Sequence, residues 1–226
     1  MRGTGPGRQK RKRPAARAAR GRVRVEVHPD GATLYGPSSA ANRFYLLRRG
    51  RIRLMRQGNG GVLRLTDVLR PGDLFGEMAG VGGTGDEEAV ASGESETLSV
   101  SVQDFRALME VQPDLAADVI RALHQRMRAL RRRVLTLATR DVRARLAQTL
   151  ADLFGAHGAP CRHGGAIELR GITHADLADL IGAARAGVSV RLSEMRRAGV
   201  LLRTGWAICA SDPRRLAERV RTPPRR

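Results

Sequence analysis

Polar and cationic side chains recur at helical spacing across residues 172–192, where they could form hydrogen bonds with a polyanion. A guanidinium near the start of a helix can donate two hydrogen bonds to O6 and N7 of a guanine, and Arg185 has that position. Ser189, Arg191 and Thr173 are better placed to hold the phosphate backbone in register. The residues predicted to contact DNA are Thr173, His174, Ala184, Arg185, Ala186, Gly187, Ser189 and Arg191.

The same segment has the layout of a helix-turn-helix, with one helix after a Thr173 cap and a second helix after a turn at Gly182. Gly182 permits a sharp turn that a β-branched residue would resist, and Ala178 supplies a small side chain where two steeply crossing helices touch. Residues 199–202 and 206–209 are predicted to form a two-stranded wing. A helical hairpin that binds no DNA is the alternative. The expected core consists of Leu177, Ala178, Ile181, Val188 and Leu192.

An excess of positive charge favours a nucleic-acid partner. The 226 residues include 41 Lys+Arg and 22 Asp+Glu, a formal net charge of +19, and such a charge attracts a polyanion whatever the fold. No stretch has the ~18 apolar residues of a membrane span, and the N-terminus lacks the apolar segment of a secretory signal. We therefore expect a cytoplasmic protein that binds double-stranded DNA and no membrane. The two cysteines are too few for a disulfide framework.

Changes of pattern divide the chain into four regions. Residues 1–22 are basic, without an acidic side chain, so we expect a disordered arm that either contacts DNA or has no function. Residues 23–112 show short, often alternating apolar runs separated by turn signals, which predicts a compact antiparallel β-domain. Residues 113–140 are predicted to form one long helix, and residues 141–226 the DNA-binding domain.

The predicted long helix carries a narrow apolar seam with arginine on its flanks. Seam spacings of three and four are typical of a two-stranded coiled coil, so we expect a homodimer built on residues 123–137. Packing of the seam on the chain's own β-domain is the alternative, and both can hold at once. A second helix is predicted over residues 142–154 and a loop over residues 155–165. The seam consists of Leu115, Val119, Leu123, Met127, Leu130, Val134 and Leu137.

Several motifs, taken in order, resemble signatures of the cyclic-AMP receptor protein and fumarate–nitrate reduction regulator (Crp/Fnr) superfamily. They are Phe44–Gly50, Pro71–Glu77, the long helix, Arg145–Leu150 and Ile172–Ala178. The resemblance implies an α+β fold with an N-terminal cyclic-nucleotide-binding-type β-roll, a long dimerisation helix and a C-terminal winged helix-turn-helix. It also implies a dimeric, sequence-specific transcription regulator that reads a palindromic DNA site, with RNA polymerase as a possible partner and no cofactor.

The region that would bind a cyclic nucleotide departs from the family pattern. Glu87 and Glu88 stand where the family has an Arg-Ser pair that binds the cyclic phosphate, and two carboxylates would repel that phosphate. Leu130 and Arg131 replace the Thr-Ser pair that meets adenine. We therefore expect no gating by cyclic AMP in the usual pose. The candidate ligand pocket consists of Gly76, Glu77, Glu87, Glu88, Arg126, Leu130 and Arg131.

The predicted recognition helix also departs from the family pattern. Where the family places Arg-Glu-Thr and a later Arg, this chain has Arg185-Ala186-Gly187 and Val190. Losing a glutamate that accepts a bond from cytosine leaves more of the specificity to Arg185 and DNA shape, so a different DNA site is expected.

Two other patterns are set aside. Gly80–Gly85 satisfies GxGxxG, but no helical pattern follows it, so no dinucleotide site is expected. His157, Cys161 and His163 could ligate a metal, yet their flexible spacing and the lack of a fourth ligand favour a solvated loop and no metal. No nucleophile, base and acid occur together in a way that supports catalysis, so the chain is not expected to be an enzyme.

Three other functions compete with a regulator that cyclic AMP does not gate. They are a small-molecule sensor that acts through protein contacts, a cyclic-nucleotide-responsive regulator with a divergent pocket, and an architectural nucleic-acid binder that uses charge alone. A palindromic motif in a sequence-selection experiment would support a sequence-specific regulator, whereas unselective binding would support the architectural binder.

Overall fold

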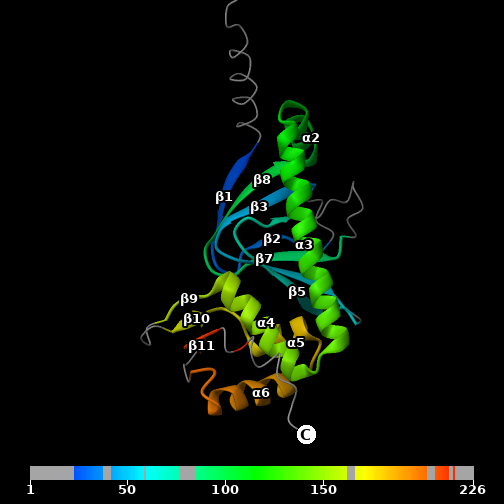
Figure 1. Ribbon diagram of the computed structural model, residues 1–226. Helices are drawn as coiled ribbons and strands as arrows, with labels where there is room; N and C mark the ends of the chain where they lie inside the picture. The colour runs from blue at the N-terminus through cyan, green and yellow to red at the C-terminus, as the bar shows by residue number, and fades with distance from the viewer. Residues whose placement is uncertain are drawn as a thin grey trace, which may run out of the picture.

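The computed structural model describes residues 23–37, 42–58, 60–76, 85–161, 166–202, 207–213 and 216. The predicted arm over residues 1–22 and the GxGxxG segment up to residue 84 lie outside the described residues. Two β-sheets form the N-terminal part, a long helix runs beside them, and a smaller part with helices and a short sheet follows (Figure 1).

The N-terminal part consists of two four-stranded sheets, in the orders β1-β8-β3-β6 and β2-β7-β4-β5. The paired strands are antiparallel. Predicted strands within residues 23–27, 44–47, 52–54, 62–65 and 98–102 lie in or overlap β1, β3, β4, β5 and β8, which confirms the β-domain. The bounds are β1 (Arg24–His28), β2 (Thr33–Tyr35), β3 (Arg43–Arg49), β4 (Ile52–Gln57), β5 (Leu63–Leu69), β6 (Leu74–Phe75), β7 (Glu87–Ala91) and β8 (Ser95–Ser101).

Aromatic side chains fill part of the space between the two sheets. Tyr35, Tyr45 and Phe75 are buried and stack on one another, with ring centroids 5.2 to 6.4 Å apart. Leu47 and Ile52 are fully buried beside them. Burying one such side chain contributes ~1.5–3 kcal/mol, so this cluster is a main source of stability for the β-roll.

Helix α2 (Val102–Val111) was not expected from the sequence. It begins after Ser101, whose hydroxyl accepts a hydrogen bond from the backbone N–H of Asp104 at 3.1 Å. Phe105 packs on Phe44 of β3, with ring centroids 4.3 Å apart. The alternating apolar run of β8 continues directly into this helix, so the change of period is hidden in the sequence.

Helix α3 (Pro113–Thr139) is the long helix predicted after Pro113. Proline at the first helical turn costs no intrahelical hydrogen bond, which explains why the helix begins there. No residue of α3 is fully buried. The first two seam residues, Leu115 and Val119, pack on the chain's own α2 and β8, whereas the seam is exposed from Leu123 onwards. The helix runs along the β-roll towards the C-terminal part (Figure 1).

The C-terminal part combines α-helices with a three-stranded sheet in the order β11-β10-β9. The helix predicted over 142–154 continues to His157, and the predicted loop over 155–165 also contains β9, so that boundary was wrong. A single bridge joins Leu202 to Cys209, as expected for the wing, whereas Trp206 lies outside the described residues. The bounds are α4 (Val142–His157), β9 (Ala159–Pro160), β10 (Ile167–Leu169), α5 (His174–Ile181), α6 (Arg185–Arg197) and β11 (Ile208–Ala210).

Helices α5 and α6 form the predicted helix-turn-helix. Thr173 caps α5, and Gly182 ends it in the left-handed conformation, with φ of 59°. Its backbone N–H turns back to the Asp179 carbonyl at 3.3 Å. The five residues predicted as the core are buried, which confirms them: Leu177, Ala178, Ile181, Val188 and Leu192.

Two glycines of this motif should respond oppositely to alanine. Gly182→Ala should cost ~1–2 kcal/mol because an L-residue resists the left-handed turn. Gly187→Ala should instead stabilise by up to about 1 kcal/mol, since Gly187 lies in helix α6 with no atom within 4 Å of an added Cβ. Urea unfolding of the full chain measures both. Equal effects of the two changes would contradict this account of the turn.

Candidate nucleic-acid interface

Thr173 and Asp176 close a reciprocal capping box at the N-terminus of α5. The Thr173 hydroxyl accepts the Asp176 backbone N–H at 3.1 Å, and the Asp176 carboxylate accepts the Thr173 backbone N–H at 2.8 Å. Thr173 is exposed, and its hydroxyl hydrogen remains available to a phosphate oxygen. This geometry suits the backbone contact predicted for Thr173.

A side-chain contact joins the start of α5 to α6. The Ser189 hydroxyl donates to the Arg185 carbonyl at 3.1 Å, so it accepts a hydrogen bond from Nδ1 of His174, 2.9 Å away. Partial burial lowers the pKa of His174, and the charges of Arg196 and Arg185 lower it further. His174 and Ser189 therefore fix the first turn of α6 relative to α5.

The first turn of α6 presents an open surface. Arg185, Ala186 and Gly187 are exposed, and Val190 on the next turn is 56% exposed. Among the described residues, no hydrogen bond or ion pair holds the Arg185 guanidinium. Figure 1 places α6 at the end of the molecule farthest from α2. A free guanidinium beside small side chains can approach a base edge closely.

Arg191 is less free than the sequence suggested. Its Nη1 lies 2.9 Å from both carboxylate oxygens of Glu194, one turn further along α6. The hydrogen bond from Arg191 is the main cause that lowers the pKa of Glu194. A phosphate contact by Arg191 must therefore compete with this intrahelical pair.

The opposite side of α5 is docked on the β-roll. Arg53 of β4 pairs with Asp176, which is 3% exposed. Arg64 of β5 pairs with Asp179 at 2.9 Å, and the other Asp179 oxygen accepts the Leu65 backbone N–H at 3.1 Å. Two carboxylates one helical turn apart thus attach the helix-turn-helix to the edge of the sheet.

Arg133 of α3 holds the other end of α5. Its Nη2 and Nε donate to the Leu180 carbonyl at 2.8 and 3.2 Å, and Nη1 donates to the Thr66 carbonyl. One guanidinium therefore joins α3, β5 and the last turn of α5. A cation there also favours the negative end of the helix dipole.

Apolar side chains of the β-roll at this interface belong to the hydrophobic core of the C-terminal part. Leu65 and Val68 of β5 belong to the same buried cluster as Leu177 and Leu192. Nε2 of His157 lies 3.3 Å from the Val68 carbonyl. Burial, followed by the charge of Arg51, lowers the pKa of His157 to about 4, so it is neutral near pH 7. This histidine therefore takes part in domain packing, in place of the solvated loop expected for it.

Glu87 and Glu88, two of the residues proposed as a ligand pocket, are held by internal contacts. The hydroxyl of Tyr35 donates to Glu87 at 2.7 Å, and Arg56 pairs with the same carboxylate at 3.5 Å. The Thr33 hydroxyl donates to Glu88 at 3.4 Å. Both positions therefore carry a carboxylate, and neither supplies a cation that would attract a phosphate.

Arg126 anchors α3 to the β-roll. It donates to the Leu74 carbonyl at 2.9 Å and pairs with Asp67 at 3.2 Å. Leu130 and Arg131 are exposed on α3. Gly76 has φ of 132°, and a Cβ there would collide with the Arg43 carbonyl oxygen, so this glycine has a structural role. Glu77 lies outside the described residues.

The docking residues were missed in the sequence reading, although one signal was present. Asp176 is three residues after the Thr173 cap, which is the spacing of a capping box. The second use of Asp176, its pairing with Arg53, joins residues 123 positions apart. No local pattern indicates such a pair.

A β-roll, a long helix and a helix-turn-helix with an exposed recognition helix define a DNA-binding regulator with a sensor-type domain. Comparison with known families agrees with this class. The family model of the cyclic nucleotide-binding domain matches residues 25–112, and that of the Crp-like helix-turn-helix domain matches residues 144–219.

Relatives with known names extend the match over most of the chain. A cyclic AMP receptor protein from Thermus thermophilus is 30% identical over 176 residues, which cover 77% of this chain and 78% of the relative. A CRP-like cAMP-activated global transcriptional regulator from Mycobacterium tuberculosis is 27% identical over 85% of this chain and 86% of its own length. A CRP-family transcriptional regulator from Thermus thermophilus has a similar structure, with a TM-score of 0.74, 25% identity and coverage of 87% and 97%.

The chain belongs to the Crp/Fnr superfamily and is a transcription regulator with a helix-turn-helix DNA-binding domain, not an enzyme. The expected α+β fold is confirmed. Within the described residues, no helix is long and apolar enough to span a membrane.

Two arginines that pair with α5 should differ in their contribution to stability. Arg53→Ala leaves the buried Asp176 charge without its cation and should cost about 3 kcal/mol. Arg64→Ala removes a side chain that is 63% exposed, from an ion pair that water screens, and should cost less than about 1 kcal/mol. Chemical denaturation of both variants measures the difference. A larger loss from Arg64→Ala would show that the Asp176 pair is not the main attachment.

Proposed function

We propose that this regulator acts in the cytoplasm as a homodimer that binds a palindromic site on double-stranded DNA through the first turn of α6. The unengaged guanidinium of Arg185, exposed beside Ala186 and Gly187, is the observation that carries the proposal. A dimer with twofold symmetry presents two such helices, and a palindrome matches that symmetry. We also propose RNA polymerase as a partner, because a regulator bound at a promoter would lie beside it.

The side chains around Arg185 divide into two roles in this proposal. Arg185 reads a guanine, because its fork of donors matches O6 and N7. Thr173 donates its hydroxyl hydrogen to the phosphate backbone, whereas Ser189 and His174 reach a phosphate only by exchanging the hydrogen bonds to the Arg185 carbonyl and to each other. Ala184, Ala186 and Gly187 allow close approach, and Arg191 reaches a phosphate only by exchanging its contact with Glu194.

Arg185→Ala tests this division of roles. The change should cost ~1–3 kcal/mol per half-site and relax selectivity at one base position, because a bidentate contact carries sequence information. Arg197→Ala is the matched control, since Arg197 is an exposed arginine at the far end of the same helix. Fluorescence anisotropy with the selected site and with single-base variants of it measures both. If Arg185→Ala weakens binding to every sequence equally, Arg185 contacts phosphate and the proposed base contact is absent.

The seam of α3 supports the dimer. Its apolar residues follow a spacing of three and four, and Leu123, Leu130 and Val134 are 54%, 45% and 65% exposed. An apolar stripe of this kind on a charged helix matches the seam of a two-stranded coiled coil. Arg126 and Arg133 on other faces of α3 hold the helix on its own domains, so the seam can face a second chain.

Replacing Leu130 and Val134 together by Asp should convert the dimer to a monomer. The two carboxylates would stand opposite their copies in the partner helix, where they would repel one another and lose their hydration. Sedimentation velocity measures the mass. Replacing the exposed Arg128 and Arg132, which flank the seam, by Ala is the control and should leave the dimer intact. A wild-type protein that sediments as a monomer would exclude this interface.

We further propose that cyclic AMP does not gate the protein in the usual pose. Glu87 and Glu88 supply negative charge on β7, and Arg56 already pairs with Glu87. Leu130, in place of a hydroxyl side chain, offers no hydrogen bond to adenine.

Millimolar cyclic AMP should change DNA affinity by less than twofold, and isothermal titration should show no micromolar binding. The double change Glu87→Arg with Glu88→Ser introduces the family's phosphate-binding pair and should increase any residual affinity. Micromolar binding to the unmodified protein that persists at high salt would contradict this part of the proposal.

A further inference from the structure

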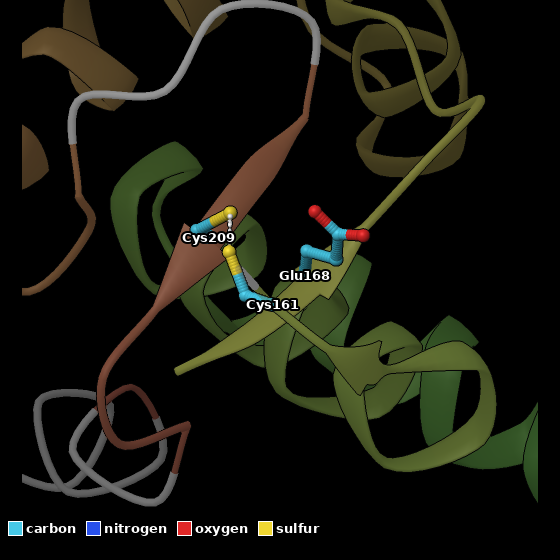
Figure 2. A group of neighbouring side chains, drawn as sticks. All are labelled: Cys161, Glu168 and Cys209. Atoms are coloured by element: carbon cyan, nitrogen blue, oxygen red, sulfur yellow. Dashed lines mark hydrogen bonds between the residues drawn. The ribbon is translucent and has the colours of Figure 1, made fainter. Parts of the chain in front are cut away.

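Cys161, Glu168 and Cys209 converge on one face of the three-stranded sheet β11-β10-β9, which we call the wing sheet. Figure 2 shows the three side chains together. Glu168 of β10 is paired with Cys209 of β11, and the Cys161 backbone N–H donates to the Ala166 carbonyl at 2.8 Å. Because side chains alternate along a strand, Ala166 and Glu168 point to the same face as their cross-strand partners. The small side chain of Ala166 leaves room for the two cysteines to meet.

The distances are those of a compact donor set. The two Sγ atoms lie 3.1 Å apart, and one ligand atom from each residue lies within 4.8 Å of the other two. Cys209 and Glu168 are buried, and Cys161 is partly buried. The Glu168 carboxylate already pairs with Arg170, and a divalent cation would join that carboxylate to the two sulfurs.

We propose that Cys161, Glu168 and Cys209 bind a thiophilic divalent metal ion of the zinc class in the wing. Thiolate sulfur and carboxylate oxygen are both ligands that Zn²⁺ accepts, and solvent can supply a fourth ligand past the partly exposed Cys161. In a tetrahedral site with zinc–sulfur bonds of about 2.3 Å, the sulfurs lie about 3.8 Å apart. Small side-chain rotations separate them to that distance.

The charges of such a site balance. On binding, each thiol releases its proton to solvent, so the ligands carry three negative charges. The metal ion contributes two positive charges, and Arg170, whose Nε pairs with Oε1 of Glu168, contributes the third.

The metal would join the three strands of the wing sheet. Cys161 directly follows β9, whereas Glu168 and Cys209 lie within β10 and β11. His157, considered with Cys161 in the sequence, contacts Val68 instead, and His163 lies outside the described residues. Metal binding is independent of the DNA contacts proposed for α6, so either proposal can fail without the other.

Cobalt titration of the full-length, reduced and metal-stripped protein tests the site. Co²⁺ should produce a thiolate-to-metal charge-transfer band and the visible bands of a tetrahedral centre, and Zn²⁺ should displace it. Cys161→Ser and Cys209→Ser should each abolish the charge-transfer band or weaken binding by far more than tenfold. Zn²⁺ should also raise the Tm of the unmodified protein.

Glu168→Gln tests whether the carboxylate is a ligand or whether the two thiols bind the metal without it. It keeps both sulfurs and should weaken Co²⁺ binding by about tenfold or more, given that even outer ligand partners contribute 10- to 100-fold. Glu194→Gln, a carboxylate on α6 away from the wing face, is the matched control and should bind Co²⁺ normally. Circular dichroism of each variant checks that it folds.

Three outcomes would overturn the proposal. The first is a reduced wild-type protein, with two titratable thiols, that shows no charge-transfer band. The second is a folded Cys209→Ser variant that keeps the charge-transfer band and binds Co²⁺ as tightly as the wild type. The third is a Glu168→Gln variant that binds Co²⁺ as tightly as the wild type, because the carboxylate would then not be a ligand.

Discussion

The placement of the DNA-binding domain depends on one buried carboxylate. Asp176 accepts the backbone N–H of Thr173 and so completes the cap of α5, and it also pairs with Arg53 of the β-roll. The same side chain therefore begins the first helix of the helix-turn-helix and attaches that helix to the sheet. Because Asp176 is 3% exposed, water cannot replace either partner without opening the interface.

Arginine suits this architecture for a geometric reason. Arg133 donates to carbonyls on two different elements, which requires several donors held in one plane, and a lysine ammonium cannot reproduce that fork. Arg53, Arg64 and Arg126 likewise join elements that are distant in sequence. Part of the positive charge thus serves internal attachment, whereas the Arg185 guanidinium makes no hydrogen bond or ion pair with the described residues.

Local signals were sufficient to predict much of the fold. Alternating apolar residues indicated the strands, the three-and-four spacing indicated α3, and Thr173 and Gly182 marked the ends of α5. Helix α2 was missed because its first residue, Val102, continues the alternation of β8. The end of α4 was also missed, since Gly155 weakens a helical pattern although it lies inside the helix.

The site could be predicted only where it is contiguous in sequence. The exposed turn from Ala184 to Gly187 follows directly from helical geometry. The pairs Arg53–Asp176 and Cys161–Cys209 join residues 123 and 48 positions apart, and only the fold brings them together. Likewise, the contact between Arg191 and Glu194 could have been inferred from their spacing of three, but its competition with a phosphate depends on the observed geometry.

The shared core at the junction has a thermodynamic consequence. Leu65 and Val68 belong to the β-roll by sequence, yet they are buried with the core of the DNA-binding domain. Any reorientation of that domain must transfer these side chains to water or to new apolar partners. Hydration of apolar surface raises the heat capacity, so a change of state at this junction has a calorimetric signature that rearranged ion pairs alone would not produce.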